Sequence, residues 1–323
     1  MTVAGAEPGP LAGVLPCVEA NIEVLLRHAG VADLLTSLGG PCTIDARPMT
    51  ELRLSPFPRD EWITRCTGLR LARAGADDGA ALTAQLRQRA GAGVPVLVYA
   101  DSYTVPWNPY AGHEHHEHAF VVDGVDTVDG VEVLHVVDAY TNATRYGNAE
   151  PGDRWVPAGD LARELRPVAD RFQLRHLEGT LHPADPAVLA AEVTAANLAV
   201  HHMAAAHGRD AAALAAFAAG GGLGFDELAW LTLAVWLVSR SRQAHVRWWQ
   251  DGHCRGADGA PAVLAAAEPV TTLWQTAQTM CYLAWRRVEA GRPCPPTLGG
   301  ALAEAAAAET RWFAAMAAAT TAT

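Results

Sequence analysis

Three short runs of β-branched and aromatic residues in the middle of the chain constrain its fold more than any other feature. VPVLVYA, HAFVVDGV and VEVLHVVDAY lie within residues 94–140, and Gly, Pro, Asp and Asn separate them, which is typical of neighbouring strands. Residues 14–90 instead have a helical pattern interrupted by loops. Because strands follow a helical segment instead of alternating with helices, the sequence predicts an α+β fold with an antiparallel sheet.

A second change of pattern divides the chain. From about residue 185 the sequence is rich in alanine and helical, and LEGTLHPADPAV, just before it, combines Gly, Pro and Asp. We therefore expect a first domain over residues 1–180 and an all-helical domain over residues 181–323. A length of 323 residues suits two domains.

Charge and composition exclude several classes of function. The net charge of −11 argues against binding nucleic acid, which needs a basic surface. All 24 basic residues are arginine, so a Schiff-base lysine and a P-loop lysine are both excluded. No apolar run has the length of a membrane span, so we expect no membrane association. No cofactor is expected.

The cysteines and the N-terminus indicate a reducing compartment. Six cysteines occur without a CxxC pair, which favours free thiols over disulfides, at positions 17, 42, 66, 254, 281 and 294. The opening MTVAGAEPGPLAGVLPC lacks the basic region of a signal peptide. We expect a cytoplasmic protein.

Cys17 is the candidate nucleophile. It stands in LPCVEANIEVLLRHAG, where apolar residues recur at helical spacing, Pro16 precedes the helix and Gly30 ends it. Cys17 is therefore predicted in the first turn, where unpaired N–H groups and the helix dipole favour a thiolate. A small hydrophobic residue at a helix start is the alternative interpretation.

His118 and Asp138 are the candidate base and orienting acid. In HEHHEHAFVVDGVD, His118 is the last polar residue before an apolar strand, and Asp138 ends the next strand in VLHVVDAYTN. If the two strands pair through a turn at Asp129–Gly130, the end of the second lies beside the start of the first. The carboxylate could then orient the imidazole, as in a nucleophilic triad.

The histidine-rich loop leaves a metal site open as an alternative. Four histidines and two glutamates could bind Zn²⁺ or Ni²⁺, although they lack the i, i+4 spacing of a helical metal motif: His113, His115, His116, His118, Glu114 and Glu117. A solvated polar loop is the other possibility.

The segment VPVLVYADSYTVPWNPYAGHEHHEHAFVVDGVD, followed by VVDAYTN, resembles the N-terminal family of butirosin biosynthesis protein H. The resemblance covers residues 14–145 and is densest over 94–142. It includes a helix-initiating Cys17 with Asn21 close by. After Gly30 the chain departs from the family pattern, so the resemblance does not define the acceptor pocket.

This resemblance implies a papain-like fold with Cys17 as nucleophile, His118 as base and Asp138 as orienting group. It further implies that an acyl group passes from a carrier-protein thioester to an amine in antibiotic or other natural-product biosynthesis. Further residues are expected to line the site or hold an oxyanion: Asn21, Asp101, Tyr103 and Trp107.

Two other functions use the same residues differently. A cysteine hydrolase, either thioesterase or peptidase, would need the same triad with water as acceptor. A helical binding protein with an inactive papain-like domain is the third possibility.

The helical half carries no motif. It could cover the sheet, shape the acceptor pocket or form a homodimer. An acidic carrier protein would need a local arginine patch, and the candidates are Arg240, Arg242 and Arg247, or Arg286 and Arg287. Core or interface positions are expected for His201, His202 and His207.

Overall fold

A computed structural model describes residues 9–251 and 260–321. It divides the chain into two compact units: residues up to Leu34 with Asp60–Pro183, and Leu35–Arg59 with Ala184–Thr323. Cys254 lies outside the described residues. No helix among the described residues combines the length and the apolar character that crossing a membrane requires.

The first unit is built on an antiparallel sheet. In the described residues its six strands follow the order β3-β10-β4-β5-β6-β9. Their bounds are β3 (Arg70–Ala76), β4 (Val96–Asp101), β5 (Glu117–Val128), β6 (Val131–Asp138), β9 (Gly152–Pro157) and β10 (Phe172–Glu178). The mixed α/β class with an antiparallel sheet is confirmed, and β4, β5 and β6 are the three strands that the sequence predicted.

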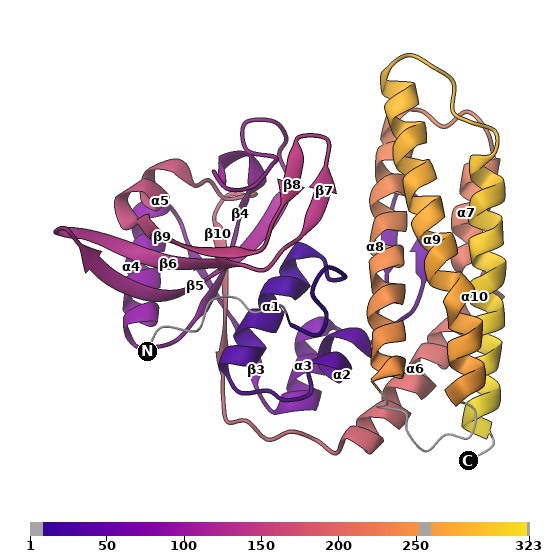
Figure 1. Ribbon diagram of the computed structural model, residues 1–323, viewed down its shortest axis with the longest axis horizontal. Coiled ribbons are helices and arrows are strands. Elements are labelled where there is room, and N and C mark those ends of the chain that lie inside the picture. Colours follow the sequence, from indigo (N-terminus) through magenta and orange to yellow (C-terminus); the bar gives the residue numbers. More distant parts are fainter. Residues whose placement is uncertain (1–8, 252–259, 322–323) are drawn as a thin grey trace. The chain divides into compact units, whose positions relative to one another are not determined.

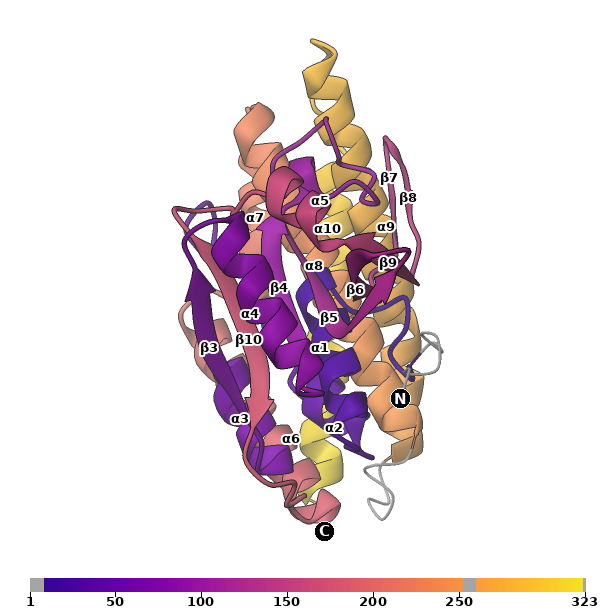
Figure 2. The same cartoon turned by 90° about the vertical axis from the view of Figure 1, so that its left-hand side faces the viewer.

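Helices lie on both faces of this sheet (Figures 1 and 2). Figure 2 shows α4 (Gly79–Gly91) crossing in front of β4 and β10, with α1 (Cys17–His28) behind the sheet. A buried apolar core joins α4 and α5 (Ala158–Glu164) to β4, β5, β6 and β10. Further short elements are α3 (Arg59–Thr67), the 3-10 turn η1 (Ser102–Thr104), β7 (Asn142–Thr144) and β8 (Gly147–Ala149).

The hairpin of β5 and β6 contains a β-bulge that decides which side chains share a face. Asp129 and Gly130 both have positive φ, as a tight two-residue hairpin turn requires, and Val128 pairs with Val131. A regular ladder from this turn would pair Asp138 with Val121 and put it on the face opposite His118.

The register instead shifts by one between Val122 and Gly124, and Val121 pairs with Val137. Continuing that register places Asp138 opposite Phe120, two residues from His118 on the same face. The extra residue, Asp123, binds the buried His135, with Oδ1 and Nδ1 2.6 Å apart. One inserted residue therefore brings the candidate acid and base to one side of the sheet.

The second unit is a bundle of helices with a small hairpin. Long helices run side by side in Figure 1, and the bounds are α6 (Pro186–Ala206), α7 (Ala211–Ala219), α8 (Phe225–Gln250), α9 (Ala260–Glu289) and α10 (Leu298–Thr321). The hairpin consists of β1 (Asp45–Arg47) and β2 (Glu51–Arg53), and α2 (Leu34–Gly39) precedes it. Among the described residues of 181–323, which the sequence predicts as all-helical, the regular elements are all helices, and the two short strands come from residues 45–53.

Side chains of the bundle hold residues 35–59 in this unit, which differs from the expected division at residue 180. Trp248 Nε1 donates to Thr36 Oγ1 over 3.0 Å, and Asn197 Nδ2 donates to the carbonyl of Gly40 over 2.9 Å. Arg242 donates to the carbonyl of Thr43 over 3.1 Å. These long-range bonds connect positions that no local pattern relates.

The arginines expected to dock an acidic partner have other contacts. Arg242 is fully buried, and its Nε and Nη2 donate to Glu309 over 3.0 and 2.5 Å. Arg240 is buried, with its guanidinium over the ring of Trp236. Arg286 pairs with Glu289 on its own helix. A docking patch through Arg240 and Arg242 is therefore wrong, because both are buried within the bundle.

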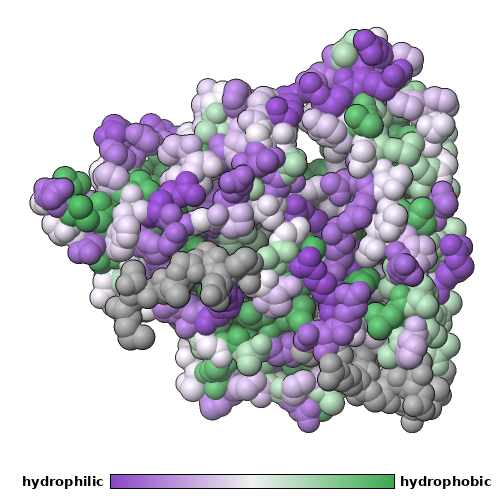
Figure 3. All heavy atoms as spheres, viewed as in Figure 1, coloured by the Kyte–Doolittle hydropathy of each residue, from purple (hydrophilic) through white to green (hydrophobic). Residues whose placement is uncertain are grey.

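The histidines of the bundle divide between core and surface. His201 is buried and stacks on Phe313 with 4.0 Å between ring centroids, as expected for a core residue. His202 and His207 are exposed. Apolar side chains also reach the surface of this unit, where Figure 3 shows them interspersed with hydrophilic ones; they include Phe225, Leu233 and Leu283.

Replacing Arg242 with Met should destabilise the bundle strongly. The substitution leaves the Glu309 carboxylate buried without its counter-ion, which costs about 3–5 kcal/mol in the free energy of unfolding. Urea denaturation of the full chain, followed by tryptophan fluorescence, measures the loss. The control Arg286→Met removes a surface pair and should cost no more than about 1 kcal/mol. Equal losses in the two variants would contradict the assignment.

Candidate active site

Cys17 begins α1 and presents its thiol at the start of β5. Pro16 occupies the N-cap position in an extended conformation without capping the helix by a side chain. The sulfur is partly exposed, and Sγ lies 3.9 Å from the carbonyl oxygen of Glu117, the residue before His118. The helix start and Gly30, which has a φ of 79° just after the helix, agree with the sequence prediction.

The His118 imidazole lies between this thiol and a buried carboxylate. His118 Nε2 is 2.7 Å from Asp138 Oδ2, and both side chains are almost fully buried. The Cys17 thiol lies within hydrogen-bonding reach of the same ring. Because Asp138 holds Nε2, Nδ1 is the nitrogen left for the sulfur. The described structure therefore brings together the three groups predicted to form a triad.

The site shifts the pKa values of His118 and Asp138 in opposite directions. Burial disfavours the charged imidazole, but the charge and hydrogen bond of Asp138, with a hydrogen bond from Cys17, outweigh it and raise the pKa of His118 to about 10. Burial likewise opposes the charged carboxylate, but His118 and the hydrogen bonds from Tyr140 and Asn21 lower the pKa of Asp138 below its ordinary value. The histidine and the acid therefore stabilise each other as an ion pair.

Asn21 connects the helix to both strands. Its Nδ2 lies 2.9 Å from the Cys17 carbonyl, 2.7 Å from the Ala119 carbonyl and 3.4 Å from Asp138 Oδ1. Its Oδ1 accepts from the N–H of Ala139 over 3.1 Å, and the side chain is fully buried. These bonds occupy the amide, so the expected oxyanion role does not fit. Asn21 instead positions α1 against the hairpin.

Trp107 covers the carboxylate. Its Nε1 donates to Asp138 Oδ2 over 3.0 Å, and its ring packs edge-on against Phe120. The guanidinium of Arg154 lies over the same ring, 4.9 Å from the centroid. The contact with Asp138 makes Trp107 a positioning residue for the acid, where the expectation was a substrate-lining one.

Asp101 and Tyr103 lie at the adjacent strand end. Asp101 ends β4 and pairs with Glu117 in the ladder, and its Oδ1 accepts from the N–H of Tyr103 over 3.0 Å. Tyr103 is 40% exposed, which leaves its ring accessible beside the start of β5. Asp101 is therefore the strand neighbour of Glu117, whose carbonyl contacts the Cys17 thiol.

The histidine-rich loop does not gather into a metal centre. His113 stacks on Tyr146, and His116 Nε2 lies 3.0 Å from Glu114. His118 belongs to the triad. No group of three or more His, Cys, Asp or Glu side chains in the described part of the chain is arranged to hold a metal ion. The interactions found favour separate roles for these histidines over the metal alternative.

Of the other cysteines, those described are less suited to react. No disulfide joins the described cysteines, and Cys42, Cys66 and Cys281 are buried. Burial raises the pKa of Cys42 and of Cys281 to about 12. Cys294 is half-buried, and burial raises the pKa of its thiol as well.

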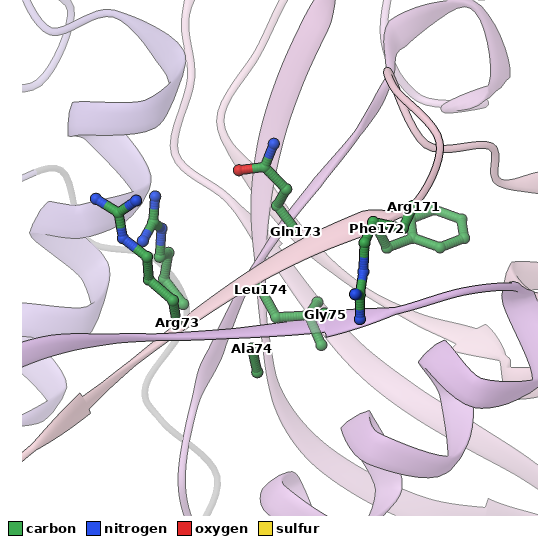
Figure 4. Close-up of a pocket in the computed structure, with 8 residues that line it drawn as sticks. Arg73, Ala74, Gly75, Arg171, Phe172, Gln173 and Leu174 are labelled. Atoms are coloured by element: carbon green, nitrogen blue, oxygen red, sulfur yellow. The ribbon is translucent and has the colours of Figure 1, made fainter.

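A hollow of about 260 Å³ lies away from the triad, on β3 and β10 (Figure 4). Arg73 and Arg171 lie on opposite sides of it. Arg73 and Arg175 share the carboxylate of Asp60, which offsets part of their charge. The sequence does not predict this hollow, because β3 and β10 are distant in sequence and carry no apolar run.

Replacing Asp138 with Asn removes the charge that stabilises protonated His118, so its effect on stability depends on pH. The raised pKa of His118 stabilises the folded state fully below pH 6.5, and this stabilisation is lost as the pH rises to about 10. The lowered pKa of Asp138 stabilises the folded state above pH 3.8, and this stabilisation is lost as the pH falls. Urea denaturation should show the largest difference from the unsubstituted protein between about pH 4 and 6.5.

The matched control is Asp126→Asn, which removes an exposed carboxylate from the same hairpin. A difference for Asp138→Asn that widens from about pH 7 to 10 would contradict the ion pair, because that is the range in which the His118 charge is lost.

No protein-family model matches the sequence, and no curated protein matches it. The geometry of the site is therefore the main ground for a function.

Proposed function

We propose that the protein is a cysteine acyltransferase with a papain-like first unit, and that it forms an amide from a thioester-bound acyl group. One observation carries the proposal: the partly exposed thiol of Cys17 meets the His118 ring, whose other nitrogen is 2.7 Å from the buried Asp138. A thiol, a base and an acid that orients the base constitute the machinery of nucleophilic acyl transfer. The family resemblance supports the same reaction.

Acylation uses the thiol and the imidazole. The proton of the Cys17 thiol resides on His118, where Asp138 stabilises it, and the sulfur attacks the acyl carbonyl carbon as the thiolate. The new C–S bond to Cys17 forms as the donor's C–S bond breaks, and the donor thiolate takes a proton from solvent. Asp138 stabilises the imidazolium, consistent with the raised pKa of His118.

The helix start supplies a donor for the oxyanion. The N–H of Cys17 belongs to the first turn of α1, whose amides have no acceptor within the helix. An N–H at this position can donate to the tetrahedral intermediate, a contribution typically worth about 3 kcal/mol. Asn21 is not needed for this role, since its bonds are internal.

The proposed donor is an acyl-carrier protein or another thioester, and the acceptor is a small amine. Thioesters suit a cysteine nucleophile because one C–S bond replaces another. Sγ of Cys17 contacts the carbonyl of Glu117, and Glu117 is exposed, so a polar residue lies next to the thiol on the side open to an acceptor. Release of the acyl group to an amine distinguishes this function from hydrolysis.

Replacing Cys17 with Ala should abolish acyl transfer and leave the fold intact. The assay incubates the full chain with the acetyl thioester of N-acetylcysteamine and benzylamine, and follows N-benzylacetamide and acetate by mass spectrometry. The unsubstituted protein should gain one acetyl group on Cys17, located by peptide mapping. The control Cys294→Ala removes another half-buried thiol and should retain activity.

Several results would contradict the proposal. Full activity of Cys17→Ala would exclude the nucleophile. Acetate as the sole product at every amine concentration would indicate a hydrolase. Failure of iodoacetamide to label Cys17 would favour a binding protein with an inactive domain.

A further inference from the structure

A second histidine–aspartate pair lies beside the triad. His115 Nδ1 is 2.6 Å from Asp101 Oδ2, and the His115 ring stacks on Tyr103 with 4.4 Å between centroids and planes only 10° apart. The hydrogen bond and the stacking fix the direction of the ring. The His115 side chain is 71% exposed, whereas that of Asp101 is 13% exposed. Because Nδ1 is held by the carboxylate, Nε2 is the nitrogen that can meet a substrate.

The backbone places this pair close to the nucleophile. Cys17 Sγ contacts the carbonyl of Glu117, and Asp101 is the ladder partner of Glu117. His115 precedes Glu117 by two residues, so no more than about 7 Å of backbone separates them. Two hydrogen bonds to Ser102 fix the position of the loop. The N–H of His116 donates to Ser102 Oγ over 3.0 Å, and the carbonyl of His116 accepts from the N–H of Ser102 over 2.8 Å. His115 therefore lies near the strand end whose carbonyl contacts the Cys17 sulfur.

The transfer step needs a base that His118 is poorly suited to provide. Once His118 has taken the proton of Cys17, Asp138 holds that proton on the imidazole, in line with the raised pKa of His118. An amine that attacks the acyl group must also lose a proton for a stable amide to form. A second imidazole at the site could accept it.

We propose that His115, oriented by Asp101, is the general base for the acceptor amine, an assignment that rests on the proposed function. The amine nitrogen forms a bond to the acyl carbon as the C–S bond to Cys17 breaks. The amine proton goes to His115 Nε2 and then to solvent, and the thiolate of Cys17 is left beside protonated His118. The proton that the donor thiolate took from solvent balances the one that His115 releases.

The test compares His115→Gln with His116→Gln in the full chain. His116 is the adjacent histidine and is 55% exposed, but its partner is Glu114. The probes are the acetyl thioester of N-acetylcysteamine and benzylamine, and the readout is the ratio of amide to acetate. Loss of the base should lower this ratio about a hundredfold in His115→Gln. His116→Gln should keep the ratio of the unsubstituted protein.

Imidazole rescue separates catalysis from positioning. Added imidazole should restore amide formation in His115→Ala, because it can occupy the emptied space and accept the proton. An unchanged ratio in His115→Gln, or a loss in His115→Ala that imidazole does not restore, would overturn the inference. Intact-mass measurement of acetylated Cys17 in each variant distinguishes a failure of the His115 assignment from a failure of the acyltransferase function. Absence of acylation in the unsubstituted protein would instead contradict the acyltransferase function itself.

Discussion

The buried carboxylate of Asp138 is the interaction on which the rest of the site depends. A charge removed from water is costly unless it is paired and hydrogen-bonded. Here the compensation comes from His118, the indole of Trp107, the N–H of Tyr140 and the amide of Asn21. These groups lie on a strand, a loop, a strand end and a helix. The hydrogen bonds to this one carboxylate therefore fix the positions of four segments around the thiol.

Helix α1 and the hairpin are joined by the same set of bonds. Asn21 lies one turn after Cys17 and reaches the carbonyl of Ala119 and the N–H of Ala139, so the thiol cannot shift without disturbing both strands. The arrangement places a reactive group at the start of a rigid helix, where the first-turn N–H groups are also available. In the proposed division of labour, Asp138 keeps the proton on the buried His118, the partner of the sulfur, and the exposed His115 serves the acceptor.

The sequence indicates where most of the chemical groups lie but not the role of each. Cys17, His118 and Asp138 were found because each stands at a recognisable boundary between a polar segment and an apolar helix or strand. The role of Asn21 was wrong because helical spacing shows proximity to Cys17 but not the strand groups that occupy its amide. The pair of His115 and Asp101 was missed, since fourteen residues separate the two and only the β4–β5 ladder brings them together.

By itself the sequence determined the start of α1, the strands β4, β5 and β6, and the helical character of the second half, because these depend on local periodicity and on Pro and Gly. Tertiary structure decided two other features. The bulge at Asp123 sets the face on which Asp138 lies, and a one-residue shift of register is not encoded in the alternation of either strand. Buried contacts from Trp248, Asn197 and Arg242 assign residues 35–59 to the bundle. Both depend on pairing between distant segments, where hydrogen bonding and burial outweigh local preference.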